Sequence, residues 1–223
     1  MDIQKVYRRF QGNFRLKRMR EFSDLFKINE KTRIIDIGGG KDNWELIDVR
    51  PWLTIVNVDA KPEKQGKTAI EIGDGCALKF SNLAFDVAYS NSVIEHVGDW
   101  NAQKRFANEV SRMAPNYYVQ TPNRRFFFEP HLLTPFMHFF PKIMQRALLR
   151  NFTVWGLIAR PSSEYVRWFL DTTQLLTVAQ VKTLFPDAQI RREKWFGMTK
   201  SIIAMRIAKD PIGQGFQGRG NDK

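Results

Sequence analysis

Residues 33–42 read Arg33-Ile34-Ile35-Asp36-Ile37-Gly38-Gly39-Gly40-Lys41-Asp42. The isoleucines form a β-branched run that predicts a short buried strand, which the three glycines end. Glycine at a strand end permits a sharp turn and leaves no side chain between the backbone and a ligand. Asp36 lies inside the apolar run, where a carboxylate must be paired or face a ligand. The segment therefore predicts a strand that leads into a ligand-binding loop, and the alternative is an ordinary turn with a capping aspartate.

A second apolar strand is predicted over residues 53–58, and Asp59 closes it 21 residues after Gly38. In a doubly wound sheet the acid at the end of the second strand reaches the ribose hydroxyls of a nucleotide that lies over the first turn. A dinucleotide-binding fold would share this feature. However, the third glycine of Gly-x-Gly-x-x-Gly would fall on Asn43, and Asp36 has no place in that fingerprint. The spacing therefore argues against a dinucleotide site.

Residues 33–97 resemble the class I S-adenosylmethionine-dependent methyltransferases of the small-molecule branch. The family's first motif, hydrophobic residues followed by Asp-x-Gly-x-Gly, is matched by residues 34–40, and its second by Asp59. Residues 73–80, Gly-Asp-Gly-Cys-Ala-Leu-Lys-Phe, look like the loop whose acid contacts the adenine amine. Residues 85–97 are similar to the fourth strand and its following turn. One departure is Asp42, which stands where many members have another glycine.

The resemblance implies an α/β fold with a Rossmann-like, mostly parallel sheet of seven strands. The implied strand order is 3-2-1-4-5-7-6 with strand 7 antiparallel, helices on both faces and a helical lid inserted after strand 5. The expected segments are an N-terminal helical cap (1–32), a cofactor-binding core (33–123), an aromatic lid (124–173), a closing helix and strand pair (174–208) and a disordered tail (209–223). Asp99 and the Thr177–Gln180 capping box predict two helix starts.

The resemblance also implies that the cofactor is S-adenosyl-L-methionine. The residues expected to bind it are Asp36, Gly38, Gly39, Gly40, Asp59, Ala60, Asp74, Gly75, Cys76, Asn91 and Ser92. Two of these have simpler alternatives. Asp74 between glycines is also common turn chemistry, and Cys76 has no visible partner that would make it reactive, which favours a packing role.

Transfer of a methyl group to a hydroxyl is helped by a base within hydrogen-bond reach of that hydroxyl. Glu129 and His131 are the first candidates, because they follow the fifth predicted strand, and His96 is the third. The alternatives are structural: Glu129 and His131 would pin the lid, and His96 would hold a turn. Tyr165 and Trp168 are candidates for contact with the acceptor. This chemistry requires no metal, and no metal site is predicted.

Composition sets outer limits on these expectations. A chain of 223 residues with 43% hydrophobic residues suits one globular domain with an insertion. The single cysteine excludes an internal disulfide and a cysteine-based metal cluster. No apolar N-terminal segment precedes a cleavage site, so the cytoplasm is the expected location. Charged residues and prolines interrupt every window of twenty in the lid segment, which argues against a membrane span.

The net charge of +12 is concentrated at the N-terminus, where seven basic residues and one acid fall within the first twenty. A basic N-terminal helix could bind RNA, an acidic membrane surface or a phosphorylated substrate, or it could present a solvated face. Apolar residues recur along it at roughly helical spacing: Phe10, Phe14, Met19, Phe22 and Phe26. A cap over the active site is favoured over a nucleic-acid arm. The lid segment likewise has three interpretations: a substrate lid, a helical completion of the core, or a contact with a membrane surface.

Three functions follow. The favoured one is methylation of a small-molecule acceptor, as an O-methylation of a sugar, a lipid-linked glycan or a related metabolite. The second is an RNA methyltransferase, which only the charge supports. The Asn/Asp-Pro-Pro-Tyr/Phe signature that holds a flipped base amine is replaced by Asn91-Ser92-Val93-Ile94. The third is a non-catalytic cofactor-binding protein. The sequence does not predict the oligomeric state.

Overall fold

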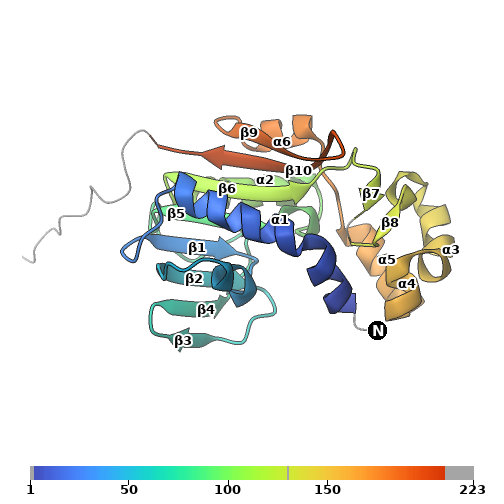
Figure 1. The fold of residues 1–223 in the computed structure, drawn as a ribbon, viewed down its shortest axis with the longest axis horizontal. Helices are drawn as coiled ribbons and strands as arrows, with labels where there is room; N and C mark the ends of the chain where they lie inside the picture. Colours follow the sequence, from blue (N-terminus) through green and yellow to red (C-terminus); the bar gives the residue numbers. More distant parts are fainter. Residues whose placement is uncertain (1–2, 130, 209–223) are drawn as a thin grey trace, which may run out of the picture.

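The computed structural model describes residues 3–129 and 131–208, and within these ranges the side chains of residues 3–11 and 13 are not described. At its centre is an eight-stranded sheet in the order β3-β4-β2-β1-β5-β6-β10-β9 (Figure 1). The strands of this sheet are β1 (Arg33–Ile37), β2 (Trp52–Asn57), β3 (Glu63–Gln65), β4 (Thr68–Ile72), β5 (Val87–Asn91), β6 (Asn116–Pro122), β9 (Gln189–Trp195) and β10 (Met198–Arg206).

Six α-helices and three short 3-10 helices accompany the sheet. The α-helices are α1 (Ile3–Leu25), α2 (Trp100–Met113), α3 (Lys142–Phe152), α4 (Val154–Ala159), α5 (Ser163–Thr172) and α6 (Val178–Leu184). The 3-10 helices are η1 (Lys41–Leu46), η2 (Ile94–His96) and η3 (Met137–Phe139). These numbers refer to the part of the chain that the structure describes.

The sheet confirms the predicted Rossmann-like α/β fold. Strands β4, β2, β1, β5 and β6 run parallel to their neighbours, whereas β10 is antiparallel to both β6 and β9. The prediction of seven strands is wrong, because β3 adds an eighth strand antiparallel to β4 at the edge. All three residues of β3 are exposed, so no apolar alternation marks it in the sequence. The remaining strands have the predicted neighbours.

One face of the sheet is covered by α1 and η1. In β1 the side chains alternate, so that Ile34 and Asp36 face this side and Ile35 and Ile37 face the other. The helices contribute Met19, Phe22, Phe26 and Trp44, which pack on Ile34, Tyr89 and Tyr118. The inward packing predicted for part of the N-terminal helix is therefore confirmed, and α1 is anchored in the core.

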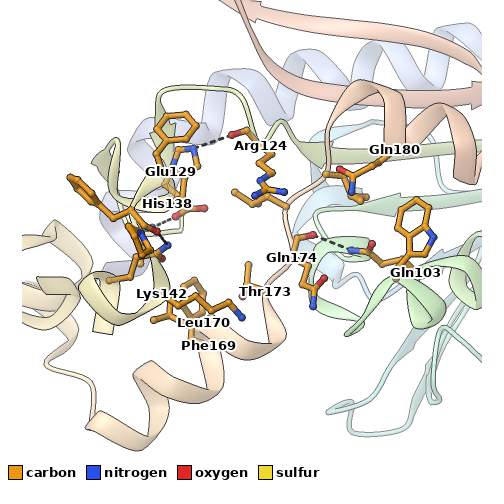
Figure 2. A pocket seen from close by; sticks show the side chains of 18 residues that line it. Gln103, Arg124, Glu129, His138, Lys142, Phe169, Leu170, Thr173, Gln174 and Gln180 are labelled. Carbon is orange, nitrogen blue, oxygen red and sulfur yellow. Dashed lines mark hydrogen bonds between the residues drawn. The ribbon is translucent and has the colours of Figure 1, made fainter. Parts of the chain in front are cut away.

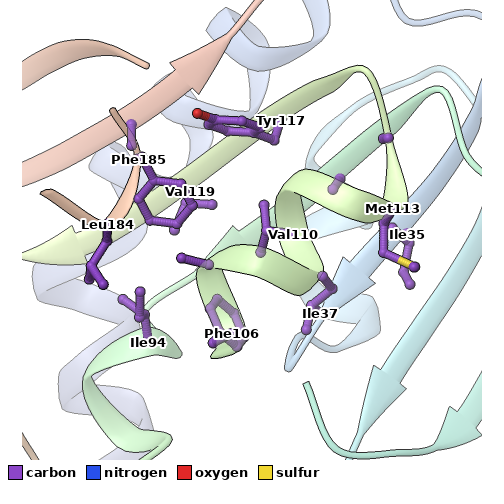
Figure 3. Close-up of a cluster of buried hydrophobic side chains, with 14 of the residues drawn as sticks. Ile35, Ile37, Ile94, Phe106, Val110, Met113, Tyr117, Val119, Leu184 and Phe185 are labelled. Atoms are coloured by element: carbon purple, nitrogen blue, oxygen red, sulfur yellow. The ribbon is translucent and has the colours of Figure 1, made fainter. Parts of the chain in front are cut away.

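The opposite face is covered by α2 and α6 (Figure 3). The predicted apolar residues of α2, Phe106, Val110 and Met113, are fully buried against the strands. Asp99 caps this helix by accepting a hydrogen bond from the Ala102 N–H at 2.8 Å. The capping box that opens α6 is also present, with Thr177 and Gln180 bonded reciprocally. Both predicted helix starts are confirmed.

The chain between β6 and α6 forms a separate body at one end of the sheet (Figure 1). It contains the strand pair β7 (Phe128–Glu129) and β8 (Thr134–Pro135) and the helices α3, α4 and α5. This lid has its own apolar cluster, formed by Leu132, Met137, Leu149, Val166 and Leu170. The segment boundaries given above stay predictions, and the predicted tail from residue 209 lies outside the described residues. In the described part of the chain, no helix combines the length and the apolar character needed to cross a bilayer.

Candidate functional site

The first two of the three glycines after β1 have no room for a side chain. Gly38 has a φ of +79°, and a Cβ atom there would lie 2.4 Å from Val93 Cγ1. A Cβ atom on Gly39 would lie 2.1 Å from the carboxylate of Asp36. The side chain of Asn57 fixes the loop by donating to the carbonyls of Gly38 and Gly39 at 3.2 and 3.1 Å. The sequence therefore places bare backbone at the carboxyl end of β1.

Asp36 lies directly beneath this loop and is fully buried. Its Oδ2 accepts a hydrogen bond from Trp44 Nε1 at 2.7 Å, and its Oδ1 has no hydrogen-bond partner among the described residues. Burial raises the pKa of Asp36 to about 7, although the bond from Trp44 works against that rise. After the loop the chain makes only η1, so no α-helix begins at Gly40.

The second predicted contact, Asp59, lies just beyond the end of β2 and is exposed. Its N–H donates to Asn57 Oδ1 at 3.2 Å, which forms a tight turn through Ala60. Asp59 and Ala60 therefore lie beside the glycine loop, because the side chain of Asn57 bonds both to this turn and to that loop. This is the position from which an acid can reach a ribose.

Asp74 and Cys76 lie past the end of β4. The carboxylate of Asp74 accepts from the Cys76 N–H at 2.8 Å, so Asp74 forms a turn, and its side chain is exposed. Burial raises the pKa of the Cys76 thiol to about 11, and its Sγ donates to the carbonyl of Ala102. Gly75 has no space for a side chain, since a Cβ atom would lie 2.8 Å from Ile37. Cys76 thus has the environment of a packing residue.

Asn91 and Ser92 lie at the carboxyl end of β5. Arg18 of α1 contacts Asn91 directly, and it also contacts Gln120, the partner of Ser92. Its guanidinium donates to Asn91 Oδ1, to Gln120 Oε1 at 3.3 Å and to both carboxylate oxygens of Glu193 at 3.0 and 3.2 Å. Ser92 has a φ of +56° and donates to the same Gln120 side chain at 2.9 Å. A non-glycine residue with this φ is under backbone strain, as is common at functional sites.

The position of Arg18 corrects one expectation. We counted it among the basic residues of a solvated or RNA-binding face, but its side chain is only 6% exposed. It is paired with Glu193 and therefore cannot contact an RNA phosphate in this arrangement. Arg18 is instead a buried cation at the carboxyl end of β5, which sequence reasoning missed.

All three predicted catalytic residues meet in one cluster. The Nε2 atoms of His96 and His131 lie 3.1 Å apart, and His131 Nδ1 lies 2.6 Å from Glu129 Oε1. The other ring nitrogen of His96, Nδ1, lies 3.3 Å from the hydroxyl of Thr173. Glu95, which was not predicted, is fully buried beside them, with Oε1 3.9 Å from His131 Nε2. The lid and the core thus contribute histidines to one site.

The ionisation of these groups is strongly shifted. Burial alone would lower the pKa of His131, but the carboxylates of Glu129 and Glu95 outweigh it and raise that pKa to about 9. Burial, together with the neighbouring His131, lowers the pKa of His96 to about 4. Burial raises the pKa of Glu95 to about 7. Perturbed groups that converge in a cleft are typical of functional sites.

A cavity of about 660 Å³ opens between the lid and the core beside this cluster (Figure 2). Glu129 and Thr173 of the cluster belong to its wall. The remaining wall combines aromatic, amide and basic side chains, including Phe139, Phe140, Phe169, Gln103, Gln174, Gln180, Arg124 and Lys142. The volume and the mixed lining suit one small organic molecule with several polar groups.

The two predicted acceptor contacts lie elsewhere. Tyr165 and Trp168 are about half exposed on α5 and contact each other, with ring centroids 5.2 Å apart. Neither residue lines the cavity, whereas Phe169 of the same helix does. The prediction named Tyr165 and Trp168, whereas the aromatic residue of α5 that lines the cavity is Phe169.

The comparisons with known proteins agree with this geometry. A family model described as "Methyltransferase domain" matches residues 7–180. The chain belongs to this methyltransferase family. A search of curated proteins gives no match.

Solved structures share the fold at low sequence identity. A magnesium protoporphyrin IX methyltransferase from Synechocystis, solved with bound SAH, is 9% identical with a TM-score of 0.54, over 92% of this chain and 87% of that one. A SAM-dependent methyltransferase from Methanosarcina mazei is 17% identical with a TM-score of 0.50, over 82% and 95%. The predicted class I methyltransferase fold is confirmed, and with it S-adenosylmethionine as the methyl donor of the class.

The carboxyl edge of this methyltransferase fits that donor. The glycine loop leaves backbone open to a ligand, the buried Asp36 retains an unpartnered oxygen under the loop, and Asp59 stands beside it. Arg18 could have been found from the sequence, because it lies four residues from both Phe14 and Phe22 on the apolar stripe of α1. Glu95 carried no comparable signal.

Proposed function

We propose that this methyltransferase transfers a methyl group to a hydroxyl of a small molecule held between the lid and the carboxyl ends of β5 and β6. The observation that carries the proposal is the mixed cavity whose wall includes Glu129 and Thr173 of the histidine cluster. We assign the donor end to the glycine loop, Asp59, the turn at Asp74 and Asn91. Arg18 orients Asn91 at that end through its hydrogen bond, while Glu193 balances the charge of the guanidinium.

Bound S-adenosylmethionine supplies a methyl group on a sulfonium, ready for displacement. The chain's task is to hold the acceptor oxygen in line with that methyl group and to exclude water, and such positioning can contribute on the order of 7 to 11 kcal/mol. As the new carbon–oxygen bond forms and the carbon–sulfur bond breaks, the acceptor oxygen must lose its proton. Among the described residues, the cluster of Glu95, His96, His131 and Glu129 is placed to promote that loss.

The outer surface of the lid favours an acceptor linked to a lipid. Ile143 and Phe152 of α3 are 77% and 67% exposed. Beside them a hollow of about 250 Å³ is lined by Arg146, Arg150 and Arg167. Apolar side chains next to clustered arginines suit a membrane surface with anionic headgroups. A lipid-linked glycan presented at such a surface would bring its hydroxyls to the cavity mouth at Phe139 and Phe140.

The RNA alternative loses support, because Arg18 is buried and paired with Glu193. A non-catalytic role also lacks a specific observation in its favour. The cytoplasmic location expected from the sequence stays a prediction, as does the oligomeric state.

Two measurements test the proposal. Calorimetry should show that S-adenosylhomocysteine binds more tightly than NAD. With methyl-labelled S-adenosylmethionine, the purified protein should label hydroxyl compounds from a panel of sugars, lipid-linked sugars and RNA transcripts. Label that appears only in RNA, or NAD that binds more tightly than S-adenosylhomocysteine, would contradict the proposal.

A further inference from the structure

We propose that Glu95, His96 and His131 bind one divalent metal ion of the Zn²⁺ type. The site itself follows from side-chain geometry, and only the role assigned to the ion rests on the function proposed above. The cluster offers two imidazole nitrogens and one carboxylate oxygen, all within 4.8 Å of one another. Two histidines and one glutamate are also the protein ligands of several catalytic zinc sites, in which the fourth position stays open.

The distance between the two histidines suits a shared ion. Two nitrogen ligands about 2.0 to 2.1 Å from Zn²⁺ lie about 3.3 Å apart at the tetrahedral angle. His96 Nε2 and His131 Nε2 are 3.1 Å apart. This separation is that of a hydrogen bond between the two rings in the ion-free protein, and it is also close to the separation that a shared ion requires.

Every candidate ligand has a second partner that orients it. His131 Nδ1 faces Glu129 Oε1 at 2.6 Å, and His96 Nδ1 faces the Thr173 hydroxyl at 3.3 Å. The Thr121 hydroxyl donates to Glu95 Oε2 at 2.9 Å. In metal sites a ligating histidine almost always makes such a bond through its other nitrogen. These bonds hold the two rings with their Nε2 atoms toward each other, so an ion would replace the contact between them.

Glu95 supplies a further, independent observation. It is fully buried, and its Oε1 has no hydrogen-bond partner among the described residues, although it points toward His131 Nε2 at 3.9 Å. A buried carboxylate oxygen without a partner is costly. A small rotation of this side chain would bring Oε1 to a cation that the histidines hold, which would remove the cost.

The ion would act on the acceptor. Glu129 and Thr173, the partners of the two histidines, line the cavity, so an acceptor hydroxyl held there could become the fourth ligand. Coordination lowers the pKa of a bound hydroxyl, and the released proton passes to water. An acceptor with neighbouring hydroxyls, such as a sugar, would be selected by this ligation.

Binding of Co²⁺ and Zn²⁺ to protein without a histidine tag tests the site. After treatment with a chelator, the wild-type chain should bind one Co²⁺ with the visible absorption of a tetrahedral site, and Zn²⁺ should displace it. His96→Ala and His131→Ala should each abolish this absorption. Thr173→Val, which removes only the partner of His96, should weaken Zn²⁺ binding about 10- to 100-fold.

Two matched variants serve as controls. His138→Ala removes the third histidine of the chain and Cys76→Ser the single thiol, and both should keep the Co²⁺ absorption. Circular dichroism and calorimetry with S-adenosylhomocysteine on the same preparations show that each variant is folded. A wild-type protein that binds S-adenosylhomocysteine but no metal would refute the metal site and leave the proposed function standing. Unchanged metal binding in both histidine variants would do the same. Loss of S-adenosylhomocysteine binding in the wild type would instead count against the proposed function.

Discussion

Arg18 in the first helix donates a hydrogen bond to the side chain of Asn91, which lies 73 residues further along the chain at the carboxyl end of β5. One nitrogen of the same guanidinium, Nη2, donates to both carboxylate oxygens of Glu193 in β9, so three distant segments meet around one buried cation. The N-terminal helix thereby reaches the carboxyl end of β5, where we propose that the donor binds.

Replacing Arg18 should weaken donor binding. We expect Arg18→Gln to make the binding free energy of S-adenosylhomocysteine less favourable by about 1.5 to 3 kcal/mol, the range for hydrogen bonds to charged groups. Arg20→Gln, an exposed arginine on the same helix, controls for the loss of one charge. Calorimetry on both variants, with thermal unfolding to check that each is folded, measures the effect. Equal affinities in the two variants would remove Arg18 from the site.

A substitution of Asp59 tests how the ribose of the donor is bound. If its carboxylate accepts from both ribose hydroxyls, Asp59→Ala should weaken S-adenosylhomocysteine binding by about 1.5 to 3 kcal/mol. The fold should survive, because the residue is exposed in a turn. Asp48→Ala removes another exposed acid and should leave the affinity unchanged. An Asp59→Ala protein with wild-type affinity would show that the residue only shapes the turn.

Asp36 should make the stability of the ligand-free protein depend on pH. Its folded pKa is raised to about 7, so the folded state favours the neutral acid. Its stabilising effect is thus complete below the unfolded pKa near 4 and is lost as pH rises toward 7. Asp36→Asn should flatten this dependence and gain stability at pH 8, by at most about 4 kcal/mol at roughly 1.4 kcal/mol per pH unit. Urea unfolding of both proteins at pH 5 and pH 8 measures the difference, and parallel curves would refute it.

The sequence predicted the regular part of this fold because local signals and tertiary packing agree there. Phe106, Val110 and Met113 repeat with helical spacing, and Asp99 marks the start of their helix. Strand β3 escaped prediction because it has no buried side and pairs only through its backbone. Arg18 was misplaced for a different reason: a basic residue was taken as exposed, although it lies on the apolar stripe of its helix.

The candidate site was predictable in its residue types but not in its contacts. His96 and His131 are separated by 35 residues, and only the path of the lid brings their rings together. Glu95 has no sequence pattern that predicts its burial, and its hydrogen bond from Thr121 of β6 joins residues 26 positions apart. The choice between Phe169 and Trp168 at the cavity depended on the rotation of α5, which spacing alone leaves open.

The rotation of α5 predicts which of its aromatic residues affects the methylation of the acceptor. Phe169→Ala should reduce kcat/KM for an acceptor found in the labelling panel by at least about tenfold, or 1.4 kcal/mol, because the ring forms part of the cavity wall. Trp168→Ala, one residue away and 57% exposed, should change kcat/KM by less than about twofold for a water-soluble acceptor. S-adenosylhomocysteine affinity should be unchanged in both variants. The reverse ranking would place the acceptor on the outer side of α5.

The lid surface can be tested with vesicles. The wild-type protein should sediment with vesicles that contain phosphatidylglycerol and much less with vesicles of pure phosphatidylcholine. The reason is that the arginines lining the hollow are attracted to anionic headgroups. Ile143→Ser should reduce this binding. Ile72→Ser, an exposed isoleucine on β4, should not reduce it. Equal sedimentation of the two variants would exclude the lid as the membrane contact.

The close packing of Gly38 on Val93 links the two ends of the site mechanically. Val93 touches the glycine loop, and Glu95 and His96 follow it within three residues on the same turn. A shift of the loop on donor binding would therefore be felt by the backbone that carries the proposed metal ligands. By linkage, an ion bound there would change the Kd of the donor by the same factor by which the donor changes the Kd of the ion.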